Sequence, residues 1–382
     1  MTIFRYGGRV EKSPKEGIIP LTLTMITRKT TRQITIGNVK IGNHAPIAVQ
    51  SMTNSDTRDV DATVAQIHDL EAAGCEIIRV AVLDLEAAAA ISRIRQQITI
   101  PLIADIHFDH RLAVASMEHG AQGIRINPGN IGGPDKLRRV VDAASQHHVP
   151  IRVGVNSGSV EKEILKKHGQ PTPDALVESA MKNVALLEKF DFHQIKISIK
   201  SSDVLTTIAA YRKLSQATDY PLHLGVTEAG GLIGGTVKSS VALGMLLYEG
   251  IGDTFRISLT RDPVEEIRVC YELLRCLKIR ERGPELISCP TCGRCQINLF
   301  GLAEKVEAHI QKMATPLKVA VMGCVVNGPG EAREADIGLA GGNGFGIIFK
   351  KGKLYKKVPE EELFDVFIRE LDAMSKESGV PD

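Results

Sequence analysis

The 382-residue chain contains no tryptophan, and its aromatic residues amount to only 4% of the sequence. A surface that stacks nucleobases needs aromatic rings, so the composition argues against single-stranded nucleic acid as a partner. Lysine and arginine (47) almost balance aspartate and glutamate (45), which argues against a duplex-binding or membrane-surface protein. Any site for an anion must therefore be local.

Long apolar runs are also missing. No stretch approaches the roughly 18 uninterrupted apolar residues of a membrane-spanning helix. The first 30 residues lack the apolar core and cleavage site of a secretory signal. The seven cysteines are an odd number, and four of them fall between residues 289 and 324. We therefore expect a cytoplasmic protein in a reducing compartment, with neither membrane nor nucleic acid as a partner.

What the sequence does contain is a regular alternation of strand-like and helix-like segments. A hairpin pattern around Gly37-Asn38 comes first. Eight short β-branched runs follow at residues 47–53, 77–82, 100–106, 123–128, 151–157, 194–200, 222–228 and 254–260. The stretch after the first run has a possible N-cap in Asp59, a stop in Gly74, and one apolar face made of Val60, Val64, Ile67 and Leu70.

Eight strand–helix units in this span favour a closed parallel barrel over a doubly wound sheet. The predicted fold class is therefore α/β, a (β/α)8 TIM-type barrel followed by a smaller α+β domain. The charged RERGPELIS segment with Gly283 and Pro284 marks the linker. We expect a flexible extension over 1–29, the barrel over 30–282 and the second domain over 283–382. That second domain should contain a helix near 302–313, a strand at 318–323, and strands joined by tight turns within 338–354.

The strand ends of the barrel, where such folds carry their chemistry, are rich in cations. Side chains alternate along a strand, so four strands each aim a pair of polar groups at a common face: Arg125 and Asn127, Arg152 and Asn156, Lys196 and Lys200, Arg256 and Ser258. Arg58 follows the first strand. A single cation at such a position usually forms a surface ion pair at the barrel rim. Several cations close together repel one another unless an anion binds between them. Because guanidinium groups fit phosphate oxygens, we predict a doubly phosphorylated small molecule.

Two carboxylates follow barrel strands, Asp105 in ADIHFDH and Glu228 in VTEAG. They could neutralise the arginines, but we expect them to act as acid or base beside the substrate. The ADIHFDH segment also contains His107, Asp109 and His110, which are metal-ligand types. Its spacing fits no fixed metal pattern, so a polar loop at the barrel mouth is the better interpretation.

The cysteine cluster near residue 290 indicates a metal site. Cys289 and Cys292 form a C-x-x-C turn, Cys295 extends it, and Cys324 follows a predicted strand. The spacing permits a four-thiolate zinc site, an iron–sulfur cluster with three or four thiolates, or a redox disulfide. Iron is favoured over zinc for two reasons. A zinc ribbon usually has two C-x-x-C turns, and Cys324 has no second cysteine at that spacing. The Glu331 carboxylate could also reach the same site as an exchangeable oxygen ligand. The remaining thiols, Cys75, Cys270 and Cys276, are expected to be buried structural groups.

The motifs QSMTNSDTRD, ADIHFD, RINPGNIG, RVGVNSGS, KISIKSSD, LGVTEAGG, CPTC and MGCVVNGPGE occur in this order. With them the chain resembles the bacterial 4-hydroxy-3-methylbut-2-enyl diphosphate synthases over about residues 30–372. The resemblance implies an oxidoreductase of isoprenoid biosynthesis in the methylerythritol phosphate pathway. It would open and dehydrate 2-C-methyl-D-erythritol 2,4-cyclodiphosphate reductively, with two electrons from reduced flavodoxin or ferredoxin.

The resemblance also implies roles for individual residues. A [4Fe–4S] cluster would be held by Cys289, Cys292 and Cys324, with Glu331 on the fourth iron, where the substrate oxygen displaces it. Glu228 would face the reacting carbon, and Asp105 is a weaker catalytic candidate. Residues matching the diphosphate site are Arg58, Arg125, Asn127, Arg152, Asn156, Lys200, Arg256 and Ser258. Cys295 departs from the ligand pattern and is either a bystander or a replacement for Glu331.

Chain geometry predicts a head-to-tail homodimer. The helix over 263–279 carries the chain about 25 Å away from the barrel mouth, at roughly 1.5 Å per residue. The linker then spans at most about 30 Å, which barely brings a domain back to its own mouth. A dimer in which each cluster domain covers the partner's barrel resolves the problem and agrees with the resemblance. The alternatives are a phosphate-ligand-binding barrel with a structural zinc ribbon and, less well supported, a pterin-binding type of barrel transferase.

Overall fold

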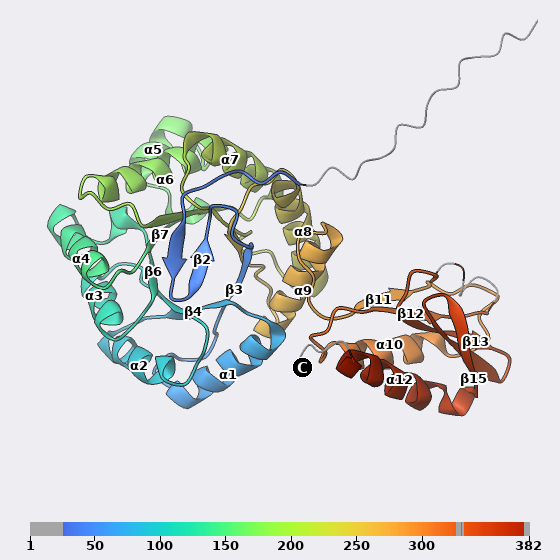
Figure 1. The fold of residues 1–382 in the computed structure, drawn as a ribbon. Coiled ribbons are helices and arrows are strands. Elements are labelled where there is room, and N and C mark those ends of the chain that lie inside the picture. The colour runs from blue at the N-terminus through green and yellow to red at the C-terminus, as the bar shows by residue number, and fades with distance from the viewer. Residues whose placement is uncertain (1–25, 326–329, 331, 378–382) are drawn as a thin grey trace, which may run out of the picture.

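A computed structural model of the chain describes residues 26–325, 330 and 332–377. It contains a ring of strands and helices and, to the side of that ring, a smaller sheet with two helices (Figure 1). Most of the expected N-terminal extension lies outside the described residues. Its last residues contact the barrel, however, because Arg28 pairs with Asp253 at 3.2 Å and the Lys29 N–H donates to the Gly250 carbonyl at 3.0 Å. The packed part of the chain thus begins before residue 30.

The predicted TIM-type barrel is confirmed, and all eight predicted strands take part. They are β3 (Ala48–Met52), β4 (Ile77–Ala81), β5 (Leu102–Asp105), β6 (Gly123–Ile126), β7 (Ile151–Asn156), β8 (Ile195–Lys200), β9 (His223–Leu224) and β10 (Thr254–Phe255). Their order is β8-β7-β6-β5-β4-β3-β10-β9, and every pair is parallel. A bridge between Ile197 and Leu222 joins β8 to the start of β9 and closes the ring.

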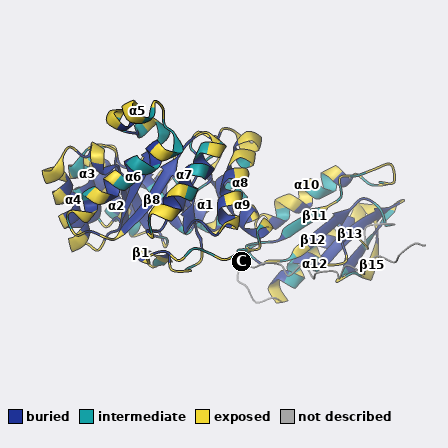
Figure 2. Cartoon of the chain, turned by 90° about the horizontal axis from the view of Figure 1, so that it is seen from above, coloured by how far each residue is buried: buried dark blue, intermediate teal, exposed yellow. Residues whose placement is uncertain are grey.

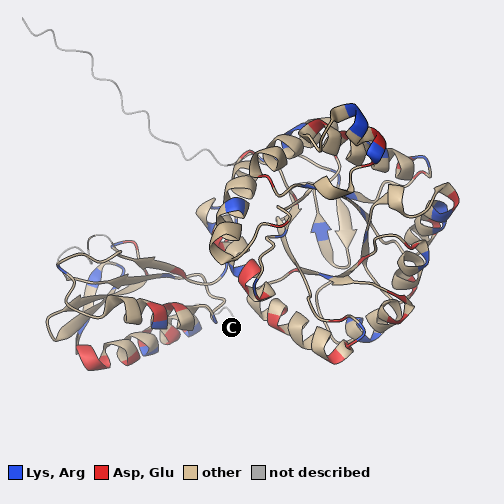
Figure 3. Cartoon of the chain, turned by 180° about the vertical axis from the view of Figure 1, so that it is seen from behind, with Lys and Arg blue, Asp and Glu red and all other residues tan. Residues whose placement is uncertain are grey.

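Helices surround this ring (Figure 1). They are α1 (Val60–Ala73), α2 (Leu85–Arg95), α3 (His110–Glu118), α4 (Pro134–Gln146), α5 (Lys162–His168), α6 (Pro173–Glu188), α7 (Val204–Ala217), α8 (Leu232–Tyr248) and α9 (Pro263–Cys276). Helix α1 begins and ends as predicted: the Asp59 carboxylate accepts the Ala62 N–H, and Gly74 ends the helix at φ 102°. Its four predicted apolar side chains are all buried. Acidic and basic residues are interspersed over the outer helices (Figure 3).

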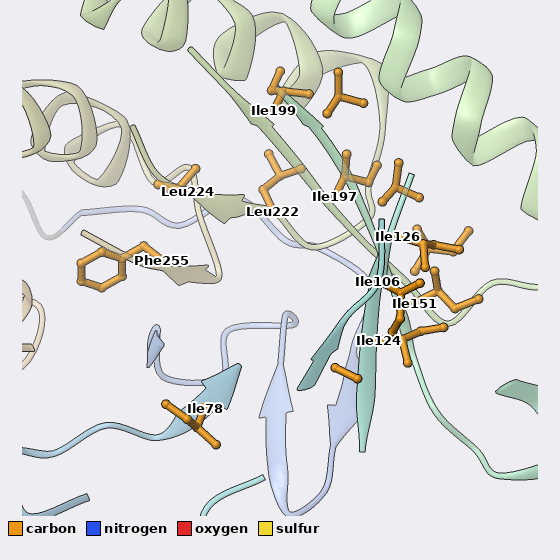
Figure 4. Packing of buried hydrophobic residues seen from close by; sticks show 14 of the residues in the cluster. Ile78, Ile106, Ile124, Ile126, Ile151, Ile197, Ile199, Leu222, Leu224 and Phe255 are labelled. Carbon is orange, nitrogen blue, oxygen red and sulfur yellow. The ribbon is translucent and has the colours of Figure 1, made fainter. Parts of the chain in front are cut away.

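Strand alternation divides the barrel into an apolar shell and a polar interior. Outward side chains such as Ile78, Ile124, Ile197 and Leu224 pack in the large core between strands and helices (Figure 4). A barrel of this type usually fills its interior with branched aliphatic residues. Here the first inward positions of three strands, Ala48, Ile77 and Ile103, are apolar, and inward positions further along the strands hold the polar side chains of the candidate site.

The N-terminal end of the barrel is closed by a hairpin, β1 (Ile34–Ile36) and β2 (Val39–Ile41). Its turn is the predicted one, with Gly37 at φ 58°. The hairpin's apolar side chains pack on the first inward residues of three barrel strands: Ile34, Ile36 and Ile41 meet Ala48, Ile77 and Ile103. The two strands of the hairpin appear inside the ring in Figure 1. The barrel interior therefore opens at the other end, where the C-terminal ends of the strands lie.

The second sheet has the predicted α+β character. Its elements are β11 (Glu285–Ser288), α10 (Leu299–Ile310), β12 (Lys318–Met322), β13 (Ile337–Gly342), β14 (Phe345–Lys350), β15 (Lys353–Pro359) and α12 (Leu363–Glu377). The strands lie in chain order, with β11, β12 and β13 parallel and the last two antiparallel. Helices α10 and α12 bury Val306 and Phe367 on one face of this sheet, and the buried layer is visible in Figure 2.

The connection between the two sheets is bonded to the closed end of the barrel. Arg280 donates to the Ile47 carbonyl at 2.6 Å and to the Glu76 carboxylate at 2.8 Å. Arg282 donates to the Ala72 carbonyl at 2.9 Å. These acceptors lie at the start of β3, before β4 and at the end of α1. The chain therefore leaves the barrel at the N-terminal ends of its strands, opposite to the open end of the interior. Among the described residues, no helix has the length and apolar character needed to cross a membrane.

Candidate functional site

Five strands bring cations into the barrel interior. Arg125 on β6, Arg152 on β7 and Lys196 on β8 are lateral neighbours in the strand register, and Lys200 lies beside Asn156. The side chains of Arg125, Arg152, Lys196 and Lys200 are at most 9% exposed. Arg256 from β10 and Arg79 from β4 complete the set. Neighbouring positive charges and burial lower the pKa of Arg152 and Lys200 well below their ordinary values, with burial the larger cause.

Two glycines make room for these side chains. A Cβ at Gly154 would lie 2.5 Å from the Arg125 Nε, and one at Gly225 would lie 2.4 Å from the Lys200 Nζ. The glycines of the RVGVNSGS and LGVTEAGG motifs thus allow a cation from a neighbouring strand to cross them. Any larger residue would displace the charged group that the interior is built to hold.

Several of the buried nitrogen atoms have no hydrogen-bond partner among the described residues. They are the Nε of Arg125, the Nδ2 of Asn127, the Nε and Nη1 of Arg152, and the Nζ of Lys196. A buried donor without an acceptor is costly, and native structures seldom leave one unpaired. Because the unpaired atoms of Arg125, Arg152 and Lys196 belong to cationic groups, the interior fits a ligand that supplies acceptor oxygens and negative charge, as a diphosphate does.

Asp105 lies among the arginines. Its carboxylate is 3.3 Å from the Arg125 Nη1, 3.7 Å from the Arg79 Nε and 3.7 Å from the His107 Nε2. Burial alone would raise the pKa of Asp105, but the charge of Arg79, a hydrogen bond with His107 and the charges of Arg125 and Arg152 together hold it well below its usual range. The lowered pKa favours the ionised carboxylate, which suits a charge partner and makes it a poor proton donor.

Arg256 is positioned by a residue that the sequence analysis did not identify. The buried Glu266, in the first turn of α9, accepts the Arg256 Nε at 3.0 Å and its Nη2 at 3.1 Å. The same carboxylate accepts the Ser51 hydroxyl at 3.2 Å and the Leu259 N–H at 3.0 Å. Such a two-pronged ion pair fixes the plane of the guanidinium group.

The remaining predicted residues lie at the rim. Arg58 is exposed, and its guanidinium donates to Asp56 at 2.6 Å and to Asp84 at 3.2 Å. Asn156 and Ser258 are half-buried. Glu228 is exposed, in the loop after β9, and has a left-handed φ of 53°. A non-glycine residue in that region stores backbone strain, which proteins tend to keep at functional sites.

Sequence reasoning missed Arg79 and His223 as well as Glu266. Arg79 interrupts the apolar run IIRVAV, and a cation at an inward strand position was the available signal. His223 is fully buried, and its Nδ1 lies 2.8 Å from the Thr254 hydroxyl. Burial and the cations around it lower the pKa of His223 well below its usual value, so the imidazole is neutral. In the ADIHFDH segment, Asp109 caps helix α3 by accepting the Arg111 N–H, as expected of a loop residue.

The cysteines of the second sheet gather at one edge. Cys289 follows β11, and Cys324 follows the adjacent parallel strand β12. The Gly323 N–H donates to the Cys289 Sγ at 3.3 Å, and the Arg294 Nε donates to the Cys292 Sγ at 3.4 Å. Hydrogen bonds to sulfur of this kind stabilise thiolates in iron–sulfur sites. The donor set at this edge therefore suits a thiolate-bound metal or cluster.

Cys295 has a different environment. Its thiol donates to the Ile297 carbonyl at 3.3 Å, and its sulfur would lie 2.8 Å from a Cβ placed on Gly323. Glu331, the expected fourth ligand, lies outside the described residues. Within the part of the chain that the structure describes, no group of three or more Cys, His, Asp or Glu side chains has the arrangement of a metal site.

The other three thiols are only partly as predicted. Cys75 and Cys270 are buried, and burial raises the pKa of Cys75 to about 12, so it stays a neutral thiol. Cys276 is exposed. The prediction that it is buried was wrong, because it is the last residue of α9, where the chain leaves the helix.

Comparisons with known proteins find relatives that match nearly the whole chain. A protein named 4-hydroxy-3-methylbut-2-en-1-yl diphosphate synthase (flavodoxin) from Desulfotalea psychrophila is 68% identical, covering 92% of this chain and 98% of that protein. The protein of the same name from Geobacter sulfurreducens is 57% identical, covering 91% and 98%. Among solved structures, dihydropteroate synthase from Stenotrophomonas maltophilia has a TM-score of 0.49 at 12% identity, covering 65% of this chain and 97% of that one.

Family models match both parts. The GcpE TIM-barrel domain matches residues 31–271, and the GcpE protein C-terminal domain matches residues 285–373. With two domain models and relatives that are more than half identical over nearly the whole chain, this protein belongs to the GcpE family.

Proposed function

We propose that this protein is an oxidoreductase of isoprenoid biosynthesis by the methylerythritol phosphate pathway. It opens 2-C-methyl-D-erythritol 2,4-cyclodiphosphate reductively and dehydrates it to 4-hydroxy-3-methylbut-2-enyl diphosphate. The name shared by its relatives supports the reaction. One observation carries the proposal for this chain: the barrel interior holds buried cations whose orphaned donors require an anionic ligand.

The diphosphate would lie among the inward side chains of β6, β7, β8 and β10. Arg125, Arg152 and Lys200 supply positive charge from three adjacent strands, and Arg256 does so from the end of β10, which only β9 separates from β8. Asn127 adds an unpaired amide donor. We assign rim contacts to Arg58, Asn156 and Ser258. Together these groups would hold two phosphates that otherwise repel each other.

The two carboxylates, Glu228 and Asp105, have different roles in this proposal, because the reaction consumes one proton. The cyclic dianion takes up two electrons and one proton, and it yields the linear trianion and one water molecule. Glu228 is exposed at the mouth and can exchange protons with solvent, so we assign the proton transfer to it. The low pKa of Asp105 suits it to holding Arg79 and Arg125 rather than to giving up a proton.

The electrons require a redox group. We propose that Cys289, Cys292 and Cys324 hold a [4Fe–4S] cluster, with Glu331 as its exchangeable fourth ligand. Such a cluster supplies electrons one at a time. The relatives' names specify flavodoxin, so reduced flavodoxin is the favoured donor and ferredoxin is the alternative. A structural zinc ribbon is disfavoured because Cys324 has no second cysteine at knuckle spacing.

The test is anaerobic purification followed by turnover. The protein should be brown, with visible absorption that bleaches on reduction, and with reduced flavodoxin it should convert the cyclodiphosphate to the linear diphosphate, followed by phosphorus NMR. A colourless protein that contains stoichiometric zinc and leaves the cyclodiphosphate intact would refute the proposal.

We also propose a head-to-tail homodimer. Arg280 and Arg282 fasten the linker to the closed end of the barrel, so the cysteine-bearing sheet starts far from its own barrel mouth. Helix α8 supplies an apolar face that a second copy can cover. Its exposed side chains follow helical spacing and include Ile233, Val237, Val241, Met245 and Tyr248. A continuous apolar stripe of this kind is typical of an interface.

Mixed dimers can test this arrangement. Arg152→Ala should disable the barrel, and Cys324→Ser should disable the cluster. A mixed dimer has one subunit of each variant. If each cluster serves the partner's barrel, this dimer contains one intact barrel facing one intact cluster. Mixing the two inactive variants should therefore restore activity. A mixed dimer that forms but stays inactive would contradict the proposal, as would a fully active monomer at high dilution.

A further inference from the structure

Arg79 is a largely buried cation of the barrel interior and is not among the residues proposed to contact the diphosphate. It lies on β4, between Met52 on β3 and Ile103 on β5 in the strand register. It faces inward because the residues on either side of it, Ile78 and Val80, belong to the outer core. Its side chain is 12% exposed.

The partners of Arg79 do not satisfy its charge. Its Nε and Nη2 donate to the Met52 Sδ at 3.2 and 2.9 Å, and a thioether is a weak acceptor. Its carboxylate partner, Asp105, is 3.7 Å away and is shared with Arg125, which is closer at 3.3 Å. Arg79 thus has charge left for another partner.

The location of Arg79 fills a gap in the ring of cations. In the closed sheet, β4 lies between β6, which carries Arg125, and β10, which carries Arg256. Arg79 and Arg125 contact the same carboxylate, Asp105, at 3.7 and 3.3 Å. Burial lowers the pKa of Arg79, and the charges of Arg256 and Arg125 lower it further. The carboxylates that contact these arginines among the described residues are Asp105 and Glu266, so positive charge is in excess.

The chemistry of ring opening supplies a partner. The bond from carbon to a bridging phosphate oxygen breaks, and that oxygen stays on phosphorus. Two electrons and one proton enter and one water molecule leaves, so the phosphate gains one negative charge. A cyclic diphosphate has one ionised oxygen on each phosphorus, whereas the terminal phosphate of the product has a second group with a pKa of about 6.

We propose that Arg79 stabilises the phosphate oxygen that is released when the ring opens. This inference rests on the proposed function and adds one residue to it. A preorganised cation aimed at a developing charge accelerates the step that creates the charge, and it binds the product more tightly than the substrate. Arg79 should therefore affect kcat more than KM.

The test uses the anaerobically purified, oxidised holoenzyme, which binds both compounds without turnover. Calorimetry gives the Kd of the cyclic substrate and of the linear product for the wild type, Arg79→Gln and Arg79→Lys. Arg79→Gln should weaken binding of the product at least about tenfold more than binding of the substrate. It should also lower kcat by about 100-fold, with a much smaller change in KM. Arg79→Lys should retain part of the preference for the product.

Arg95→Gln is the matched control, because Arg95 donates to the Ile100 carbonyl outside the barrel interior. It should leave both Kd values unchanged. Equal weakening of substrate and product in Arg79→Gln, or a raised KM at unchanged kcat, would overturn the inference. If Arg79→Gln fails to fold, the neutral Arg79→Met takes its place, and a wild-type kcat with a wild-type preference for the product in that variant would also overturn the inference. Failure of the wild type to turn over the cyclodiphosphate would instead refute the proposed function.

Discussion

The ion pair between Arg256 and Glu266 predicts a large loss of stability when the carboxylate is removed. Glu266 is 2% exposed, and its two oxygens accept from Arg256, Ser51 and the Leu259 N–H. Glu266→Gln replaces one acceptor with a donor and leaves the guanidinium without its counter-charge. Breaking a buried pair in this way costs about 3–5 kcal/mol. Because the Arg256 side chain keeps 15% exposure, we expect the lower end, about 3 kcal/mol.

Urea denaturation can measure this cost. Far-UV circular dichroism is the suitable probe, since the chain has no tryptophan. With a slope of about 1–3 kcal/mol per molar urea, the midpoint of Glu266→Gln should fall by about 1 M or more. Glu265→Gln is the control, because the neighbouring Glu265 forms a surface pair with Arg268, and its loss should cost no more than about 0.5 kcal/mol. Equal midpoint shifts for the two variants would refute the reasoning.

Three further predictions concern the cysteines, a helix end and pH. Cys295→Ser should keep its iron and visible absorption, whereas Cys324→Ser should lose both; loss in the Cys295 variant would make it a ligand. Gly74→Ala should destabilise the protein by about 1 kcal/mol or more in urea, because φ is 102°, whereas Gly234→Ala, with open space around it in α8, should not. Since the folded-state pKa of Asp105 is depressed, its contribution to stability is present above about pH 4 and lost as pH falls below it. The urea midpoint should therefore fall less between about pH 5 and pH 3 in Asp105→Asn than in the wild type.

Local patterns in the sequence predicted most of the fold. The hairpin turn at Gly37, the cap at Asp59 and the stop at Gly74 each depend on residues close together in the chain, and each is as predicted. The eight strands were recognisable because β-branched runs alternate with helical periods. Strand alternation also placed Arg125 and Arg152 on inward positions, since a strand's period of two leaves no other choice.

Contacts between distant segments could not be read in this way. Glu266 looks like an ordinary acidic residue in the first turn of a helix, where the helix dipole favours it. Only the packing of α9 on β3 brings it to Arg256. Arg79 looks like one charge in an apolar strand. Asp105 was expected to move protons, but its pKa depends on cations from other strands, which a sequence does not place in space.

The hairpin that closes the barrel affects how substrate enters and product leaves. Ile34, Ile36 and Ile41 pack against the first inward residues of the strands, so within the described residues the hairpin closes the interior at that end. Substrate must enter and product must leave by the same route. If the second copy's cysteine-bearing sheet covers that opening during reduction, it has to lift away once in every catalytic cycle, so the rate of uncovering sets an upper limit on turnover.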